Sequence, residues 1–249
     1  MEIETEYYLT DKIRIYNDMM EYRVNEESDF KPILKNNWHL ILEDYGWEKF
    51  PRKWITVLNK FSKNKERNSL FGILDCAADG DCFFHCISHS LNEKNIGTDI
   101  YYNSNDIRRL ISENITVDQY DIIIGYYRIM KDADDFDEDW DPYLIKSIED
   151  FKKKIITSGH EYWGDYMLLQ ILIKALNINI FILNSNSLLN EYSIYNTLNE
   201  YNPDYASIFL LYEDMCHFKL IGYFNGHKMI SYFTDHSIPQ ELKSLYNIN

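Results

Sequence analysis

The hydrophobic positions of the first 65 residues predict helices. An apolar face between residues 13 and 22 is followed by a break near Pro32, and an aromatic-rich segment then runs from Trp38 to Pro51. A further short helix is expected from Trp54 to Phe61. The polar run from Ser62 to Asn68 is typical of a linker. We therefore expect a helical extension over residues 1–65 and a separate domain over residues 66–249. The apolar face comprises Ile13, Ile15, Tyr16, Met19, Met20 and Tyr22.

Beyond the linker, helical and strand-like patterns alternate. Tyr166 to Leu176 is a strongly apolar helical pattern that stops at Asn177. Three short apolar runs are typical of strands: Ile178 to Leu183, Ser207 to Tyr212, and His217 to Tyr223. Helices alternating with short strands predict an α/β (α+β) fold with a small central β-sheet between helical layers.

The net charge of the chain limits the classes of partner that it could bind. The formal net charge is −15, and no Lys/Arg cluster is present that could neutralise phosphates, so we expect no nucleic-acid partner. The same acidity would attract a basic partner, although it would equally serve solubility alone.

Four cysteines in 249 residues do not make a disulfide framework. The acidic N-terminus lacks the basic region of a signal peptide, and no apolar run approaches the ~18 residues that a membrane helix needs. We expect a soluble monomer that works in a reducing, cytoplasmic compartment, with no membrane partner.

The candidate chemistry begins at Cys82. The turn Asp79-Gly80-Asp81 ends an apolar run and opens a helix, which places Cys82 at a helix N-terminus, where the positive end of the dipole favours a thiolate. His217, on a late strand, is a candidate general base and acid for that thiol. The backbone N–H groups from Gly80 through Asp81 to Cys82 are candidate oxyanion donors, because a helix-opening turn aims several amides at one point.

These segments resemble the OTU (ovarian tumour) family of cysteine proteases, which are deubiquitinases. Asp79-Gly80-Asp81-Cys82-Phe83-Phe84 is similar to the family's Asp-Gly-x-Cys-x-Phe box, and His217-Phe218 to its histidine followed by an aromatic residue. Tyr162 to Asp165 and the helix after it resemble the family's Trp-Gly turn and following helix. The similarity spans roughly residues 66 to 225, and it also implies a helix over Ile107–Ile115.

The resemblance implies a papain-related OTU fold and hydrolysis of (iso)peptide bonds at the C-terminal glycine of ubiquitin. Ubiquitin or polyubiquitin chains, whose C-terminal tail is basic, would be the partner, and no cofactor or metal would be required. The abundance of Asn, Ile, Lys and Tyr suggests an AT-rich genome. With the resemblance, this suggests a viral or intracellular-bacterial protein acting in the host cytosol on ubiquitin signalling.

The residue that orients His217 is an open question in the sequence. Many OTU members carry Asn or Asp two positions after the histidine, but that position here is Lys219, which has no acceptor. Asp79, which the family often counts in its active site, is our first candidate for a third catalytic residue. Asn225 and Asp235 are substitutes of lower rank, and a two-residue Cys/His site is a further alternative.

Three other interpretations stay open. Lys219 would suit a non-catalytic ubiquitin-binding module on the same fold. Cys82, His85, Cys86 and His89 share one helical face and could contribute to a structural zinc site, although one helix cannot surround an ion. The acidic stretch over residues 132–141 is typical of a solvated loop, with a docking surface for a basic substrate as the rival interpretation. We expect Trp163 to be a packing residue, and Cys86 and Cys216 to be buried or incidental thiols.

Overall fold

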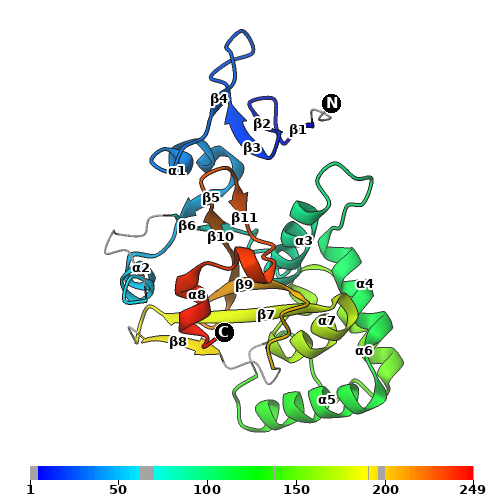
Figure 1. Cartoon of the computed structure of the whole chain (residues 1–249). Coiled ribbons are helices and arrows are strands. Elements are labelled where there is room, and N and C mark those ends of the chain that lie inside the picture. The colour runs from blue at the N-terminus through cyan, green and yellow to red at the C-terminus, as the bar shows by residue number, and fades with distance from the viewer. Residues whose placement is uncertain (1–4, 62–69, 137, 190, 196–199, 249) are drawn as a thin grey trace.

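A mixed seven-stranded sheet forms the centre of the computed structural model, which describes residues 5–61, 70–136, 138–189, 191–195 and 200–248. Its strands follow the order β5-β6-β10-β9-β7-β8, with β11 paired to β10 (Figure 1). Among the strand pairs that the structure describes in this sheet, β7 and β9 are parallel and the others are antiparallel. The strands are β5 (Trp47–Lys49), β6 (Phe71–Asp75), β7 (Ile178–Asn186), β8 (Glu191–Tyr195), β9 (Ala206–Glu213), β10 (His217–Phe224) and β11 (Met229–Ile230).

Helices cover both faces of the sheet, which confirms the expected α/β architecture. One hydrophobic core joins the sheet to α3 (Cys82–Lys94), α4 (Ser104–Asn114), α5 (Val117–Asp132), α6 (Ile148–Ile156) and α7 (Leu169–Leu176). A second core joins the opposite face to α2 (Arg52–Leu58) and α8 (Gln240–Leu245). Short 3₁₀ turns occur at Glu43–Tyr45, Gly159–Glu161, Tyr166–Leu168 and Asp235–Ser237.

The continuous apolar runs of the central strands reflect burial on both faces. In β9, Ile208 and Leu210 point into the first core, while Phe209 and Leu211 point into the second. Side chains alternate along a strand, so a strand covered on both faces is apolar at most of its positions. The predicted strands at residues 178–183, 207–212 and 217–223 are therefore confirmed, each within one to three residues of its observed ends.

The prediction of helices near the N-terminus is wrong for residues 6–32. These residues form a separate four-stranded sheet of β1 (Glu6–Tyr8), β2 (Ile13–Tyr16), β3 (Met19–Tyr22) and β4 (Lys31–Pro32). Asn17 and Asp18 both have positive φ and turn β2 into β3, as the favoured two-residue hairpin turn requires. Ile13 and Ile15 are buried with the polar Arg14 between them, so the true period was two rather than 3.6. The helical prediction holds better further on, in α1 (Trp38–Ile41) and α2.

The predicted boundary at residues 65–66 lies outside the described residues. The central sheet nevertheless begins before it, because β5 pairs with β6 in antiparallel register. The small sheet is also joined to the domain: the Met20 N–H donates to the His227 carbonyl at 2.8 Å, and Lys228 pairs with Asp18.

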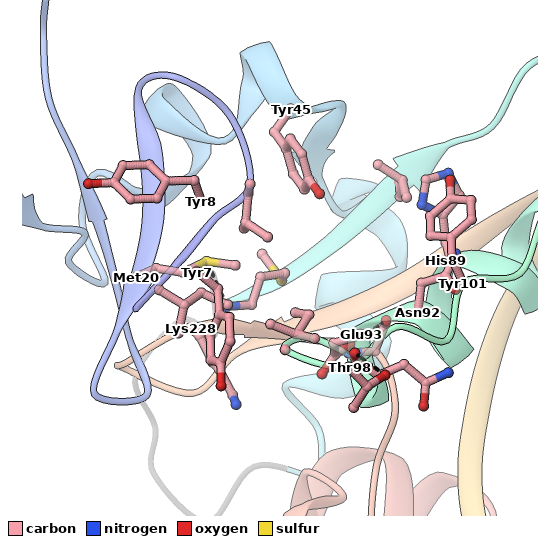
Figure 2. A pocket seen from close by; sticks show the side chains of 18 of the residues that line it. Tyr7, Tyr8, Met20, Tyr45, His89, Asn92, Glu93, Thr98, Tyr101 and Lys228 are labelled. Carbon is pink, nitrogen blue, oxygen red and sulfur yellow. Dashed lines mark hydrogen bonds between the residues drawn. The ribbon is translucent and has the colours of Figure 1, made fainter. Parts of the chain in front are cut away.

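A cavity of about 620 Å³ lies where the N-terminal sheet meets helix α3 (Figure 2). Tyr7 and Tyr8 line it from the extension, and His89 and Glu93 line it from α3. Three donors bind the Glu93 Oε2 atom: the Ser231 N–H, the Ser231 hydroxyl and the Tyr232 N–H. Burial raises the pKa of Glu93 to about 7 in spite of these hydrogen bonds.

The acidic stretch over residues 132–141 is only partly the solvated loop that the sequence predicted. Residues 132–135 are exposed, but Trp140 is buried and Glu138 is half-buried. Glu138 accepts hydrogen bonds from the Trp140 indole at 2.6 Å and from the Trp163 N–H at 3.2 Å. Burial raises its pKa to about 7. Glu138 therefore supports the turn at Trp163, whereas Asp139 beside it is exposed.

Helix α5 was not predicted from the sequence, although its N-terminus carries a recognisable capping signal. Thr116 and Gln119 form a reciprocal capping box, with the Thr116 side chain accepting from the Gln119 N–H and Gln119 accepting from the Thr116 N–H.

None of the helices in the described ranges combines the length and apolar character needed to cross a bilayer.

Candidate active site

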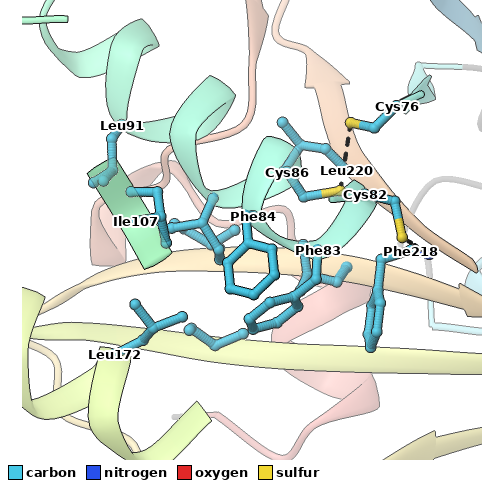
Figure 3. Close-up of a cluster of buried hydrophobic side chains, with 14 of the residues drawn as sticks. Cys76, Cys82, Phe83, Phe84, Cys86, Leu91, Ile107, Leu172, Phe218 and Leu220 are labelled. Carbon is cyan, nitrogen blue, oxygen red and sulfur yellow. Dashed lines mark hydrogen bonds between the residues drawn. The ribbon is translucent and has the colours of Figure 1, made fainter. Parts of the chain in front are cut away.

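Cys82 is the first residue of helix α3, as the sequence predicted. Asp81 is the N-cap, and the aromatic rings that follow anchor the helix: Phe83 packs edge-on against Phe84 and against Phe218 of β10. The Cys82 side chain is only 8% exposed, and its sulfur accepts a hydrogen bond from the Phe218 N–H at 3.4 Å (Figure 3). The opening turn of α3 thus lies directly against the beginning of β10.

His217, the first residue of β10, interacts with Cys82 and with Asp75. Its Nε2 atom lies 2.8 Å from the Asp75 Oδ1 atom. A hydrogen bond with the Cys82 side chain and a second with Asp75 raise the pKa of His217 to about 9, although desolvation opposes the shift. If Nε2 donates to Asp75, then Nδ1 is the nitrogen left for the sulfur.

No local pattern in the sequence points to Asp75, because the expected positions for the orienting group lie after the histidine and at Asp79. It is the last residue of β6, and its cross-strand partner in β10 is Lys219. The available signal was an acidic residue at the end of an apolar strand that leads into the cysteine turn. Strand pairing cannot be read from one sequence, so the position opposite Lys219 could not be identified.

Among the described residues, Lys219 makes no contact that would orient the imidazole. Its ammonium lies 2.9 Å from Glu213 and 3.7 Å from Asp75. Asn225 and Asp235, the substitutes of lower rank, are engaged elsewhere: Asn225 accepts the His227 and Lys228 N–H groups, and Asp235 pairs with Lys243. Asp75 is thus the described acidic residue that contacts His217.

Asp79 faces its own turn. Its carboxylate accepts the Asp81 N–H at 2.9 Å and lies 3.2 Å from the His85 ring. Desolvation alone would raise the pKa of Asp79, but these hydrogen bonds outweigh it and hold the pKa below its ordinary value. Within the described residues, no hydrogen bond joins Asp79 to Cys82 or His217.

The three candidate oxyanion donors differ in whether their N–H group already donates a hydrogen bond. The Asp81 N–H already donates to Asp79. For the Cys82 and Gly80 N–H groups, no acceptor is found among the described residues. Gly80 has φ +86°, and a Cβ there would lie 2.4 Å from the Gly159 carbonyl, so both conformation and space require glycine.

A buried ion pair holds this turn in place. Arg108 of α4 and Asp81 are almost completely buried, and the Arg108 Nε donates to Asp81 at 2.7 Å. The guanidinium also donates to the carbonyls of Ile155 and Tyr162 at 2.8 Å each, and it lies 3.9 Å from the Phe84 ring centroid. Arg108 therefore joins the cysteine turn to α6 and to the segment before Gly164.

The Trp-Gly turn differs from its prediction at one residue. Trp163, expected as a packing residue, is 39% exposed, whereas Tyr162 is fully buried. At Gly164, a Cβ would lie 2.6 Å from Phe83 and 2.8 Å from Phe84, so glycine allows this turn to approach the rings of α3.

The helical face proposed for zinc does not gather into a site. In the part of the chain that the structure describes, the donor group close enough to hold an ion is Asp79, Asp81 and His85, and Asp81 is already paired with Arg108. Cys86 is buried, as expected, whereas Cys216 is exposed.

Comparison with known proteins identifies the family to which this sequence is similar. The family model described as "OTU-like cysteine protease" matches residues 77–220, more than half of the chain. Curated proteins gave no match.

Several solved structures of low sequence identity to this chain are similar to it. They include an OTU deubiquitinase from Wolbachia pipientis wMel bound to ubiquitin, with 14% identity, TM-score 0.43 and coverage of 64% of this chain and 99% of that one. The viral OTU domain protease from Farallon virus has 18% identity, TM-score 0.40 and coverage of 63% and 86%. The Hazara virus OTU bound to ubiquitin has 14% identity, TM-score 0.38 and coverage of 90% and 97%.

The matched segment contains the cysteine turn and reaches His217 and the first half of β10. On the family match, the chain belongs to the OTU-like cysteine proteases.

Proposed function

We propose that this protein is a deubiquitinase that hydrolyses (iso)peptide bonds with Cys82 as nucleophile, His217 as general base and acid, and Asp75 as the residue that orients His217. The observation that supports this assignment best is geometric: the His217 Nε2 atom lies 2.8 Å from Asp75, and the N–H of the next residue, Phe218, donates to the Cys82 sulfur. With a pKa of about 9, His217 carries a proton at neutral pH, so an imidazolium can face a cysteine thiolate.

In this mechanism the Cys82 sulfur attacks the scissile carbonyl carbon, and the carbonyl π electrons move to oxygen. The Cys82 and Gly80 N–H groups are the donors proposed for that oxygen, because both lack an acceptor among the described residues. His217 gives its proton to the leaving amine as the C–N bond breaks, which leaves a thioester on Cys82. Water, deprotonated by His217, then attacks the thioester carbonyl carbon. The C–S bond breaks, which releases the carboxylate product and restores the Cys82 thiolate beside the protonated His217.

Asp75 would hold the ring in the orientation that these proton transfers need. A carboxylate beside Nε2 fixes the tautomer and stabilises the imidazolium. Lys219, although it replaces the residue usual in the family, lies 3.7 Å from the same carboxylate. Asp75 supplies the acceptor that Lys219 lacks, so Lys219 no longer favours a non-catalytic binding module.

Ubiquitin is the substrate that the family membership suggests, and it is the partner named in the Hazara virus and Wolbachia structures. The net charge of −15 suits a partner whose C-terminal tail is basic. We propose that this charge mainly accelerates association, so the association rate should fall as salt rises.

Cleavage of diubiquitin tests the proposal. Each linkage should be incubated with the wild-type protein, Cys82→Ala and, as a matched control, Cys216→Ser, which removes an exposed thiol. We expect cleavage by the wild type and by Cys216→Ser, and none by Cys82→Ala. Ubiquitin binding without cleavage of any linkage by the wild type would instead identify a binding module.

A further inference from the structure

Two cysteines next to the nucleophile lie in sulfur-to-sulfur contact. The Sγ atoms of Cys76 and Cys86 are 3.6 Å apart, and both side chains are buried (Figure 3). Cys76 follows β6 directly, and Cys86 lies on α3, one helical turn after Cys82. A buried thiol is usually an inert apolar filler, but such fillers have no need to face each other.

We propose that Cys76 and Cys86 are an oxidative modification site, a dithiol that a peroxide converts reversibly into a disulfide. A disulfide bond is about 2.05 Å long, so the sulfurs need to approach by about 1.5 Å from their present separation. Small rotations about the Cα–Cβ bonds, shared between the two residues, can supply movement on this scale with little displacement of the backbone.

Cys76 is the thiol expected to react first, because 6% of its surface is exposed whereas Cys86 is fully buried. Its thiolate attacks one peroxide oxygen; an S–O bond forms, the O–O bond breaks, and the departing hydroxide is protonated to water. The Cys86 sulfur then attacks the Cys76 sulfur. The S–S bond forms as the S–O bond breaks, and the second hydroxide takes the Cys86 proton, so two thiols and one peroxide give one disulfide and two waters.

Burial around the pair favours this second step over further oxidation. Cys86 is held in the core by its helix, with its sulfur facing Cys76, so the resolving thiol is already in place. Burial also raises the pKa of Cys86 well above its ordinary value, which keeps it from reacting directly with peroxide.

The disulfide would connect the two elements that carry the candidate active site. Cys76 adjoins Asp75, which contacts His217, and Cys86 shares its helix with Cys82. A misplacement of about 1 Å at a catalytic group can lower a rate by about 10²-fold, so even the small backbone adjustment that remains between Asp75 and Cys82 should lower hydrolysis. This consequence rests on the proposed function; the disulfide itself does not.

The site is tested in the double variant Cys82→Ala/Cys216→Ser of the 249-residue chain, which retains Cys76 and Cys86 as its thiols. After treatment with hydrogen peroxide, we expect the intact mass to fall by two hydrogens, both thiols to escape alkylation in denaturant, and dithiothreitol to restore them. Cys76→Ser and Cys86→Ala, each in the same background, should gain oxygen on the remaining cysteine or stay unchanged, and never lose two hydrogens.

Oxygen addition without loss of two hydrogens in the double variant, or thiols that stay fully alkylatable, would overturn the proposal.

A second experiment tests the effect of the disulfide on hydrolysis. It compares the Cys216→Ser variant with the Cys76→Ser/Cys216→Ser variant after peroxide treatment, so that direct oxidation of Cys82 is common to both. A larger reversible loss of activity when Cys76 is present supports the coupling to the active site. Equal losses would reject the coupling. A wild type that forms the disulfide but shows no hydrolysis even when fully reduced would reject the proposed hydrolase and leave the disulfide proposal standing.

Discussion

The His217 Nε2 atom lies 2.8 Å from the Asp75 carboxylate, although 142 residues separate the two along the chain. Antiparallel pairing of β6 and β10 produces this contact, because it places the last residue of β6 beside the beginning of β10. The position two residues after the histidine can consequently be lysine without leaving the imidazole unsupported.

Replacing Asp75 should therefore impair hydrolysis. We expect Asp75→Asn to lower kcat/KM by roughly 10²-fold, the lower range for a positioned acid–base group, because the amide no longer stabilises the imidazolium. Steady-state hydrolysis of a ubiquitin C-terminal fluorogenic amide measures this. Asp79→Asn is the matched control, since Asp79 contacts His85 and not His217; a greater loss in the control would assign the orienting role to Asp79.

The pH dependence of hydrolysis should report the ionisation of His217. Because the protonated ring is the active form and its pKa is about 9, activity should fall as pH rises through about 9. Asp75 helps to raise that pKa, so Asp75→Asn should move the alkaline limb to lower pH. A kcat/KM profile of both proteins tests this, and identical alkaline limbs would argue against the contact.

The Arg108–Asp81 pair should be a principal source of rigidity at the cysteine turn. Arg108→Met leaves the buried Asp81 carboxylate without its cation, and we expect a loss of about 3–5 kcal/mol in the free energy of unfolding. Adding Asp81→Asn should recover part of that loss, because the buried charge is removed. Arg109→Ala, on the exposed side of the same helix, should change stability by no more than about 0.5 kcal/mol in urea denaturation. An equal effect of the two arginine variants would contradict this assignment.

Glu93 should make stability depend on pH. Its pKa rises from an ordinary 4.5 to about 7 on folding, so the folded state binds more protons than the unfolded state between these values. Stability from this group therefore decreases as pH rises from about 4.5 to 7. Glu93→Gln keeps an acceptor for the Ser231 and Tyr232 donors, and we expect a flatter dependence of Tm on pH. An unchanged slope between pH 4.5 and 7 would show that Glu93 does not titrate there.

Sequence patterns identified the elements that are governed by local signals or by burial on both faces. The buried strand after Asn177 and the helix beginning at Cys82 follow directly from apolar runs and turn residues. Residues 13–22 were misassigned because a hairpin of two four-residue strands offers few positions in which a period of two differs from 3.6. Asp75 and Arg108 depend on strand register and helix packing, which bring together residues distant in sequence, and no local pattern encodes that.

The most direct measurement is the site of covalent capture by ubiquitin that carries a C-terminal electrophile. Wild-type protein should form one adduct, mapped by peptide mass spectrometry to Cys82, and Asp75→Asn should form the same adduct more slowly. Adduct on Cys216 instead, or undiminished labelling of Cys82→Ala, would contradict the assignment of Cys82 as the nucleophile.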